Sequence, residues 1–402
     1  MPNRTSLIVR SPLFALVLAA CSVDAAPADT IAPAGEPTRP ATNDDTTTGE
    51  ETAPGTPAAP AEEAAAVAPA ACATAPKLAT GHAYETVECP TQLGGINHWA
   101  SANAWKKLDA VPVTVAVLDG AFNTEHPDLS GAFALTYNFA KPQCATYDAG
   151  DAACTNVSPP PSPPAAQLGA INHGTIISGV IAGRGEPGRG IVGVNPSAKI
   201  LGVGRDASND NLKALAWAVG QKPDVISMSW PLGPAPGERE VPAFEALLEE
   251  ATAKGIVVVM AAGNTKTNVD DKALYPTRYS AIPGVIAVGA VDDDGAFFAQ
   301  FSNYGPRYVD IGAPGKVISS GGDYATGRYS VQAGTSFSGP LVAAAASRVI
   351  QYLKDKDVTY TAADVERLVV EGSKADPKLE PYFREGRVLD MTTLHAHVTA
   401  KH

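Results

Sequence analysis

Five short, almost continuously apolar runs constrain the fold of this 402-residue chain more than any other feature. They are Val113–Leu118, Ile200–Val203, Val225–Met228, Ile256–Ala261 and Val285–Val291. Runs of this length and composition are typical of strands buried on both faces, as in a parallel sheet. Stretches of helical character fall between and after them, at 174–182, 212–219, 244–253, 339–353 and 362–370. The alternation predicts an α/β fold of three layers, in which helices cover both faces of a mostly parallel central sheet.

The charge of the chain is concentrated in its N-terminal part. The formal net charge is -12, and residues 22–71 account for -8 of it, because nine acidic residues there face one base, Arg39. No basic cluster is present, so we expect no nucleic-acid partner. Residues 22–75 are rich in Ala, Pro, Thr and acids and hold almost no large apolar side chain. Such a segment buries too little surface to offset its ordering entropy, which predicts a disordered tether.

The first residues have the pattern of an export signal. Arg4 and Arg10 flank the start of the chain, and the apolar stretch Leu13–Ala20 is too short to span a bilayer but fits a signal peptide. It ends at Cys21 and resembles the signal of bacterial lipoproteins, in which this Cys is acylated and becomes the mature N-terminus. The alternative is an ordinary secretory signal that contains a Cys. We therefore expect a bacterial envelope protein, either anchored by lipid at Cys21 or secreted, and Ser22, which is no acidic retention signal, favours the outer membrane.

The cysteine count agrees with export. Five Cys is an odd number, and assigning Cys21 to lipid leaves four, which allow three disulfide connectivities. Pairing near neighbours, Cys72–Cys89 and Cys144–Cys154, closes short loops and is our prediction. An oxidising envelope compartment would permit both bonds.

The composition divides the chain into four parts. They are a signal peptide at 1–21, the tether at 22–75, a Cys-bearing lead-in at 76–91 and a globular domain at 92–397. Within the domain, residues 140–169 are polar, carry two Cys and include a Pro-rich run. We predict that this stretch is a surface insertion.

Three polar residues occur at positions that are suited to a catalytic site. Asp119 ends the first apolar run, where an unpaired buried carboxylate would be costly. His173 is expected to open a helix, and Ser336 lies in a Gly-bounded turn before a helix, whose N-terminus favours a developing oxyanion. Each residue alone is more often a cap, turn or surface residue. Together they indicate a site, because a serine nucleophile needs a base and the base needs an orienting acid.

The order of these residues and their surroundings resemble the subtilisin-like serine proteases. Val115–Asp119 resembles the Asp segment of that family, and the chain from His173 to Gly183 resembles its His segment. Gly334–Pro340 matches the Ser signature, and Ala261–Asn264 resembles the segment that carries the oxyanion Asn. The resemblance covers roughly residues 92–395, and its segments agree in order and spacing.

This resemblance implies a serine endopeptidase that hydrolyses peptide bonds through an acyl-enzyme. Ser336 would be the nucleophile, His173 the general base and Asp119 the acid that orients it. Asn264 would be an oxyanion donor. The substrate-binding residues that the resemblance implies are Ser229, Trp230, Pro231, Gly233, Ala262 and Gly263.

The chain departs from the family pattern at Trp230 and Pro231, where small residues are usual. Proline also lacks the N–H that could pair with a substrate backbone. One interpretation is an altered primary pocket with narrow specificity. The other is that Trp230 packs locally and the pocket shifts by a residue. The sequence favours neither.

The implied chemistry requires no cofactor, and we assign no metal. Structural calcium is common in the family, but the acidic turns at 270–271 and 292–294 are more often solvated loops. The expected partners are a protein or peptide substrate and a membrane, reached through the lipid anchor, and we expect a monomer. A catalytically silent binding protein with the same fold is the alternative function. An esterase has little support, because Ser336 lacks the G-x-S-x-G elbow.

Overall fold

The computed structural model describes residues 96, 98–139, 141, 144, 152–157, 165–186, 189–205, 211–230, 240–323 and 328–402. The predicted signal peptide at 1–21, the tether at 22–75 and the lead-in at 76–91 lie outside these residues. So do Cys21 and the predicted Cys72–Cys89 pair. Among the helices of the described chain, none combines the length and the apolar character needed to cross a bilayer.

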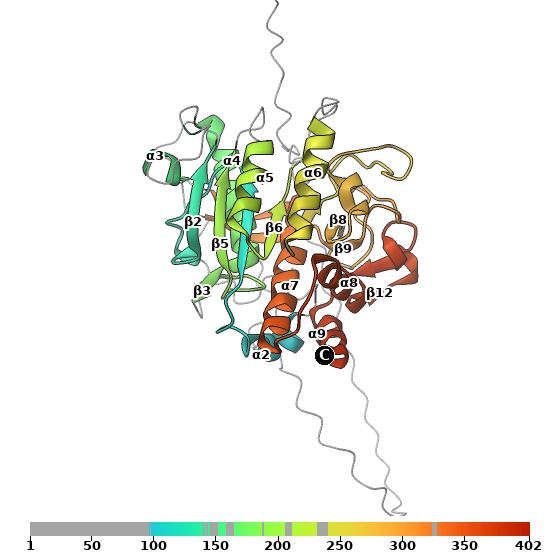
Figure 1. Cartoon of the computed structure of the whole chain (residues 1–402). Helices are drawn as coiled ribbons and strands as arrows, with labels where there is room; N and C mark the ends of the chain where they lie inside the picture. Colours follow the sequence, from blue (N-terminus) through green and yellow to red (C-terminus); the bar gives the residue numbers. More distant parts are fainter. Residues whose placement is uncertain are drawn as a thin grey trace, which may run out of the picture. The chain divides into compact units, whose positions relative to one another are not determined.

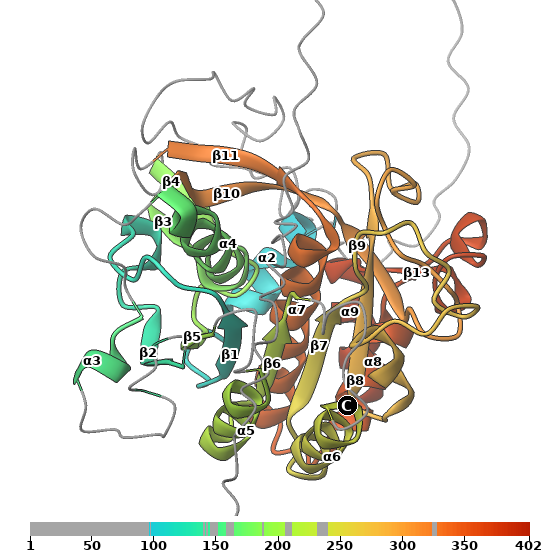
Figure 2. The ribbon, with the colours of Figure 1, turned by 90° about the horizontal axis from the view of Figure 1, so that it is seen from above.

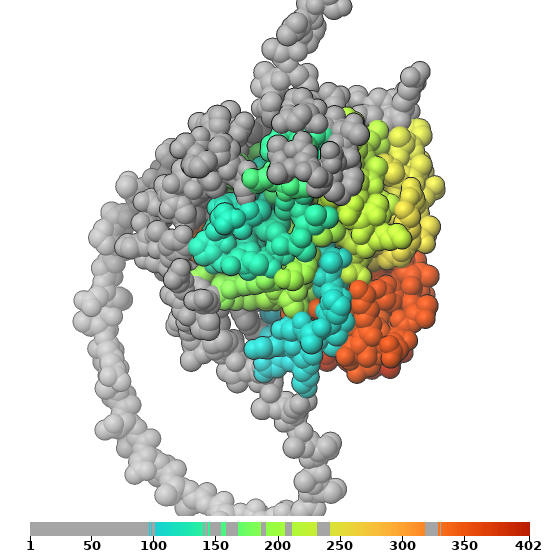
Figure 3. Space-filling model, turned by 60° about the vertical axis from the view of Figure 1, so that its left-hand side comes forward, coloured from blue at the N-terminus to red at the C-terminus, as the bar shows by residue number. Residues whose placement is uncertain are grey.

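A mostly parallel sheet forms the centre of the fold (Figure 1). In the described part of the chain it has nine strands, in the order β12-β13-β9-β8-β7-β6-β1-β5-β2. They are β1 (Thr114–Asp119), β2 (Phe133–Asn138), β5 (Lys199–Gly204), β6 (Val225–Met228), β7 (Val257–Ala261), β8 (Val285–Val291), β9 (Ile311–Pro314), β12 (Lys374–Ala375) and β13 (Arg387–Val388). All neighbours pair in parallel except β12 and β13, which are antiparallel. Figure 3 shows the face on which the edge strand β2 lies, in blue-green.

The apolar runs of the sequence form the middle of this sheet. The five predicted strands are β1, β5, β6, β7 and β8, with ends that differ from the prediction by one residue at most. Two small antiparallel sheets lie outside the main one. The first pairs β3 (Arg184–Glu186) with β4 (Arg189–Val192), and the second pairs β10 (Lys316–Asp323) with β11 (Arg328–Ala333).

Helices cover both faces of the sheet, which confirms the three-layer prediction. They are α2 (His98–Lys106), α3 (Ala152–Thr155), α4 (Ala165–Ala182), α5 (Asn211–Gln221), α6 (Glu240–Ala253), α7 (Thr335–Asp355), α8 (Ala362–Gly372) and α9 (Met391–Lys401). Figure 2 shows α4 on one side of β1, β6 and β7, and α5 and α6 on the other.

Alternate side chains of the central strands enter two separate cores. Val115 and Val117 of β1 join the core that includes α4, α7 and α8. Ala116 and Leu118 join the core that includes α5 and α6. All four are fully buried, and removing one large aliphatic side chain from water contributes about 1.5–3 kcal/mol. Asp119 is the only charged residue of β1. It is the last residue of the strand, where the strand reaches the edge of the two cores.

Three predicted helix starts were wrong. The helix predicted at 244–253 begins four residues earlier, at Glu240, because Pro242 is tolerated in the first turn of α6. The helix predicted at 174–182 begins at Ala165, so His173 lies inside α4 and does not open it, and residues 165–169 belong to α4 rather than to an insertion. The sequence just after Pro164 is Ala-Ala-Gln-Leu, which favours a helix, and a proline is tolerated before the first turn. The helix predicted at 339–353 begins four residues earlier, at Thr335, because Pro340 lies close enough to the N-terminus to be accommodated.

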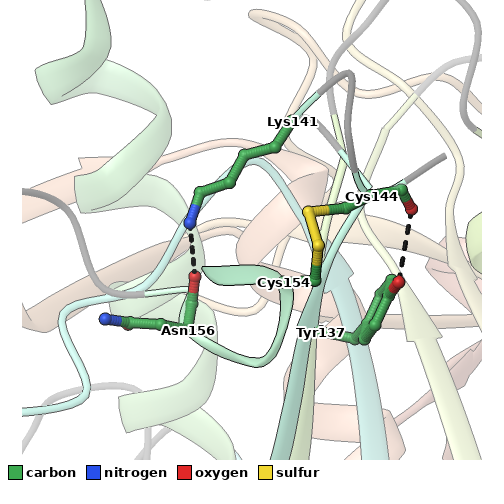
Figure 4. Close-up of a disulfide and its surroundings, with 5 residues drawn as sticks. All are labelled: Tyr137, Lys141, Cys144, Cys154 and Asn156. Atoms are coloured by element: carbon green, nitrogen blue, oxygen red, sulfur yellow. Dashed lines mark hydrogen bonds between the residues drawn. A yellow bond between two sulfur atoms is a disulfide. The ribbon is translucent and has the colours of Figure 1, made fainter. Parts of the chain in front are cut away.

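The predicted disulfide between Cys144 and Cys154 is present (Figure 4). Both sulfurs belong to buried residues, and the bond spans a sequence separation of 10. The hydroxyl of Tyr137 donates to the carbonyl of Cys144 at 3.4 Å, and the amino group of Lys141 donates to the carbonyl of Asn156 at 3.2 Å. The Tyr137 contact attaches the described part of the insertion to β2, and the Lys141 contact joins two parts of the insertion to each other.

The first and last helices of the described domain pack against each other. Trp105 of α2 is fully buried, and its indole N–H donates to the carbonyl of Met391 at 3.2 Å. Its ring meets the ring of His395 edge-on, with centroids 4.9 Å apart. The N–H of Met391 in turn donates to the carbonyl of Ile96 at 2.7 Å. The core around α2 therefore needs α9.

A buried ionic network attaches the C-terminal segment to the sheet. Asp310, whose side chain is 0% exposed, forms an ion pair with Arg384 and accepts from the N–H of Ala287 at 2.7 Å. Arg384 also contacts Glu366 at 3.1 Å, and Glu366 accepts from the N–H of Gly284 at 2.6 Å. Burial raises the pKa of Asp310 to about 8, more than the charge of Arg384 lowers it. Arg384 thus provides the positive charge that both buried carboxyl groups, those of Asp310 and Glu366, contact.

We predict that Arg384→Met lowers the free energy of unfolding by about 3–5 kcal/mol in mildly alkaline solution, because it leaves buried carboxyl groups without their partner. The loss should be smaller below the folded pKa of Asp310, about 8, where that carboxyl still holds its proton. It should grow as the pH rises through this value, since the carboxyl ionises beside Arg384 in the wild type but not in the variant. Urea denaturation at several pH values measures both effects.

The matched control is Arg367→Met, because Arg367 is 57% exposed and pairs with Asp364 at the surface. Its removal should cost little at any of these pH values. Equal losses in the two variants would contradict the prediction.

Candidate active site

The parallel register brings several polar residues to one edge of the sheet. Leu118 of β1 lies opposite Met228 of β6, and Met228 lies opposite Met260 of β7. The carboxyl ends of these strands therefore align, and in open α/β sheets functional residues gather there. Asp119 and Ser229 are the next residues along two of these strands.

Asp119 and His173 form a close pair. The Nδ1 atom of His173 lies 2.9 Å and 3.1 Å from the two carboxylate oxygens of Asp119. The carboxylate also accepts from the N–H of Gly120 at 2.7 Å, and its side chain is only 5% exposed. With Nδ1–H donating to the carboxylate, Nε2 is left as the basic atom of the ring.

The charge of Asp119 controls the protonation of His173. Burial lowers the pKa of His173, but the charge and hydrogen bond of Asp119 raise it further than burial lowers it. The charge of Arg205 acts in the opposite direction and lowers the pKa. The net result is a pKa of His173 above the ordinary value of 6.5.

Gly174 allows α4 to bring His173 this close to the end of β1. A Cβ atom at position 174 would lie 2.2 Å from the carbonyl oxygen of Ala121 and 3.1 Å from the ring of Phe122. Any larger residue would push α4 away from the chain that follows Asp119. A glycine is therefore required after His173, because the backbone of α4 and that of Ala121 lie so close together at this point.

Ser336 lies beside this pair, as the second residue of α7. Its N–H belongs to the first turn of the helix and has no acceptor within the helix. Its hydroxyl donates to the carbonyl of Ser229 at 3.3 Å rather than to His173. The next residue, Phe337, meets the ring of His173 with centroids 5.5 Å apart. The structure thus places the predicted acid and base in contact, and the residue that follows the predicted nucleophile packs against the predicted base.

Thr335 fixes the side-chain amide of Asn264. Asn264 Oδ1 accepts from the backbone N–H of Thr335 at 2.9 Å and from its hydroxyl at 2.8 Å. The same hydroxyl accepts from the N–H of Gly263 at 3.0 Å. Since Oδ1 is occupied, Nδ2 is the group that Asn264 can offer to another acceptor. Asn264 is thereby bound to the first residue of α7, the neighbour of Ser336.

Asn303 holds the loop that carries Asn264, a role that sequence reasoning missed. It is 2% exposed, and its Oδ1 accepts from the backbone N–H groups of Thr265 and Thr267 at 2.9 Å and 3.0 Å. Its Nδ2 donates to the carbonyl of Ala262 at 2.8 Å. In the sequence, Asn303 is one polar residue in a loop-like stretch that ends in Gly305 and Pro306, and nothing there indicates the residues that it holds.

Gly263 allows the loop to pass close to Asn303. Its φ is +98°, in the left-handed region that favours glycine, and a Cβ atom there would lie 2.6 Å from Asn303 Nδ2. A larger residue at this position would therefore separate the loop from the side chain that holds it.

The predicted substrate-binding residues differ in their surroundings. Ser229 and Ala262 are buried, and Gly263 is partly exposed. Trp230 is 6% exposed, its indole N–H donates to the carbonyl of Leu118 at 3.0 Å, and the guanidinium of Arg205 lies 4.0 Å from its ring centroid. This is local packing, one of the two arrangements that the sequence left open. Pro231 and Gly233 lie outside the described residues.

The acidic turns considered for calcium make contacts within the protein. Asp292 Oδ1 accepts from the N–H groups of Asp294 and Ala296 at 3.0 Å and 2.9 Å, and Asp293 pairs with Lys316. Over the part of the chain that the structure describes, no group of three or more His, Cys, Asp or Glu side chains is arranged to hold a metal ion. A structural calcium therefore stays unassigned.

Comparison with known proteins identifies relatives of this chain. The sequence model of the subtilase family matches residues 112–386. Subtilisin amylosacchariticus from Bacillus subtilis subsp. amylosacchariticus is 32% identical over 263 residues, which are 63% of this chain and 58% of that protein. An intracellular serine protease from Paenibacillus polymyxa is 32% identical over 265 residues, 64% of this chain and 72% of that protein. A thermophilic serine proteinase from Bacillus sp. (strain AK1) is 33% identical over 239 residues, 58% of this chain and 51% of that protein. The chain thus spans little more than half the length of several relatives that it matches.

We predict that Asp119→Asn moves the pKa of His173 below 6.5, because burial and Arg205, which lower it, remain while the carboxylate that raises it is gone. An NMR titration of labelled histidine measures this without any assumption about activity. His395 is an internal control, since burial and Lys107 set its pKa and neither changes. An unchanged midpoint for His173 would show that Asp119 does not set its protonation.

Proposed function

This chain belongs to the subtilase family, and from that premise we propose that it is a serine endopeptidase with Asp119, His173 and Ser336 as its triad. The observation that carries the proposal is the pair of His173 Nδ1 and Asp119, 2.9 Å apart, beside the N-terminus of α7. That pair gives the imidazole the tautomer and orientation of a general base.

The first half of the reaction is acylation of Ser336. Rotation about its Cα–Cβ bond turns the hydroxyl from the carbonyl of Ser229 toward Nε2 of His173. The oxygen attacks the carbonyl carbon of the scissile peptide bond, and His173 takes the hydroxyl proton. The N–H of Ser336 and Nδ2 of Asn264 stabilise the negative oxygen that forms. The intermediate collapses when the imidazolium gives its proton to the leaving amine, and the acyl group stays on Ser336.

The second half repeats these steps with water. His173 takes a proton from a water molecule, whose oxygen attacks the ester carbonyl. Collapse of the second intermediate releases the carboxyl product and returns the proton to Ser336. Asp119 remains ionised throughout and stabilises the imidazolium. No cofactor enters this cycle.

The proposed substrate is a protein or peptide in an extended conformation, and the proposed enzyme is a monomer. We propose that the chain from Ser229 to Gly233, with the backbone of Ala262 and Gly263, borders the bound substrate. The local packing of Trp230 supports a pocket formed by the residues around it rather than by its own side chain.

A fluorophosphonate probe tests the proposed function, because it reacts covalently with an activated serine. We predict labelling of the wild-type chain and none of Ser336→Ala, since that variant lacks the nucleophile. Ser338→Ala is the matched control: Ser338 lies in the same helix turn, and its hydroxyl donates to the carbonyl of Pro314 instead. An unlabelled but folded wild-type protein would support the catalytically silent binding protein.

We also propose that Cys21 is acylated and anchors the enzyme to the bacterial envelope, on the outer membrane. The sequence Leu-Ala-Ala-Cys at positions 18–21 supports this, as does the acidic, Pro-rich chain that follows. Buried acyl chains add about 0.8 kcal/mol of membrane affinity per methylene, so several would hold the protein firmly.

Metabolic labelling with an alkyne fatty acid tests this anchor in a bacterial host. The expected result is a labelled wild-type protein in the membrane fraction, and an unlabelled Cys21→Ser variant. Cys144→Ser is the control, because that Cys is held in a disulfide. A wild-type protein that is exported without label would favour the ordinary secretory signal.

A further inference from the structure

Helix α7 carries a proline where the nucleophile needs a hydrogen-bond donor. In an α-helix the carbonyl of one residue accepts from the N–H of the residue four positions later. For Ser336 that residue is Pro340, which lies inside α7 and has no N–H. The carbonyl of Ser336, the second residue of α7, therefore lacks the donor that an α-helix normally supplies to it.

Ser229 supplies the missing donor from the sheet. Its hydroxyl donates to the carbonyl of Ser336 at 2.9 Å, across 107 residues of sequence. Ser229 is 5% exposed and Ser336 is 7% exposed, so water has little access to this bond. The contact is reciprocal, because the hydroxyl of Ser336 donates to the carbonyl of Ser229 at 3.3 Å. The two serines hold each other at the rim of the sheet.

This bond fixes the part of the backbone on which catalysis would depend. The carbonyl belongs to the peptide that follows Ser336, so its direction is coupled to the direction of the Cα–Cβ bond and of the Ser336 N–H. A buried carbonyl without a donor is unfavourable, and the peptide plane would turn to find one. Such a turn would displace both the nucleophilic oxygen and the oxyanion donor.

We propose that Ser229 is a positioning residue, whose hydroxyl replaces the backbone donor lost at Pro340 and so orients Ser336 for attack. The proposal rests on the proposed function, because it concerns the geometry of the same nucleophile. It gives the side chain of Ser229 a task distinct from the contact with substrate that the family resemblance implied for this residue.

A double-mutant cycle between positions 229 and 340 tests the inference, with the rate of fluorophosphonate labelling as the readout. Ser229→Ala should slow the labelling step at saturating probe by about tenfold or more, while the probe concentration for half-maximal rate stays unchanged. Pro340→Ala should change the rate less than about threefold. In the double variant the N–H of residue 340 can donate to Ser336, so its rate should return to within about threefold of Pro340→Ala.

The other outcomes overturn the inference. If Ser229→Ala labels at the wild-type rate, its hydroxyl does not position the nucleophile. If Ser229→Ala slows labelling equally in both backgrounds, the effect does not pass through the Ser336 carbonyl. Should Ser229→Ala fail to fold, Ser229→Cys is the substitute. Its thiol is a weak donor of similar size, so the rate should fall between those of wild type and the unlabelled Ser336→Ala, and Pro340→Ala should restore it.

If the proposed function itself is wrong, the experiment gives a different result. In that case the wild-type protein is not labelled at all, and the cycle is read from thermal unfolding. The hydrogen bond then predicts that Ser229→Ala lowers the melting temperature more in the wild-type protein than in the Pro340→Ala variant. Equal drops would remove the proposed compensation.

Discussion

The shared register of β1, β6 and β7 is the constraint on which the candidate active site depends. Leu118, Met228 and Met260 lie in one row across three parallel strands, so all three strands end at the same level. The residues that follow them, Asp119 above all, reach the same rim. A shift of one residue in either pairing would turn every side chain of a strand toward the opposite core, so that Val115 and Val117 would have to fit where Ala116 and Leu118 now pack. The cost of repacking two close-packed cores therefore holds the rim in place.

The rim itself is held by side-chain contacts with backbone groups. Thr335 and Asn303 bind the loop of Asn264, Gly174 lets α4 approach β1, and Ser229 caps a carbonyl of α7. Each contact joins two elements that are far apart in sequence. The groups that would react are thus fixed by neighbours whose own positions are set by the sheet, which is the arrangement that preorganised chemistry requires.

The sequence was sufficient for the centre of the fold and for the identity of the candidate triad. Uninterrupted apolar runs made β1, β5, β6, β7 and β8 visible. In contrast, β2 is half-buried, β9 contains Gly and Pro, and β12 and β13 have two residues each. The start of α4 was missed because Pro-rich sequence masked the helix formers after it. Asn303 and Thr335 were not identified, because their roles depend on partners 36 to 72 residues away. Trp230 was ambiguous for the same reason, since its partners Leu118 and Arg205 belong to the ends of other strands.

The packing of α9 against α2 has a consequence for the order in which the protein is made. Trp105 is translated early, but the carbonyl that its indole requires belongs to Met391, 286 residues later. Ser336 also precedes the strand β13 and the helices that close the same core. A nascent chain that has passed Ser336 therefore still lacks the acceptor for Trp105 and the last side chains of this core, Met391 and Leu394 among them. The core around the first helix closes only when the C-terminal helix has been made, so the two ends of the described domain must complete their folding together.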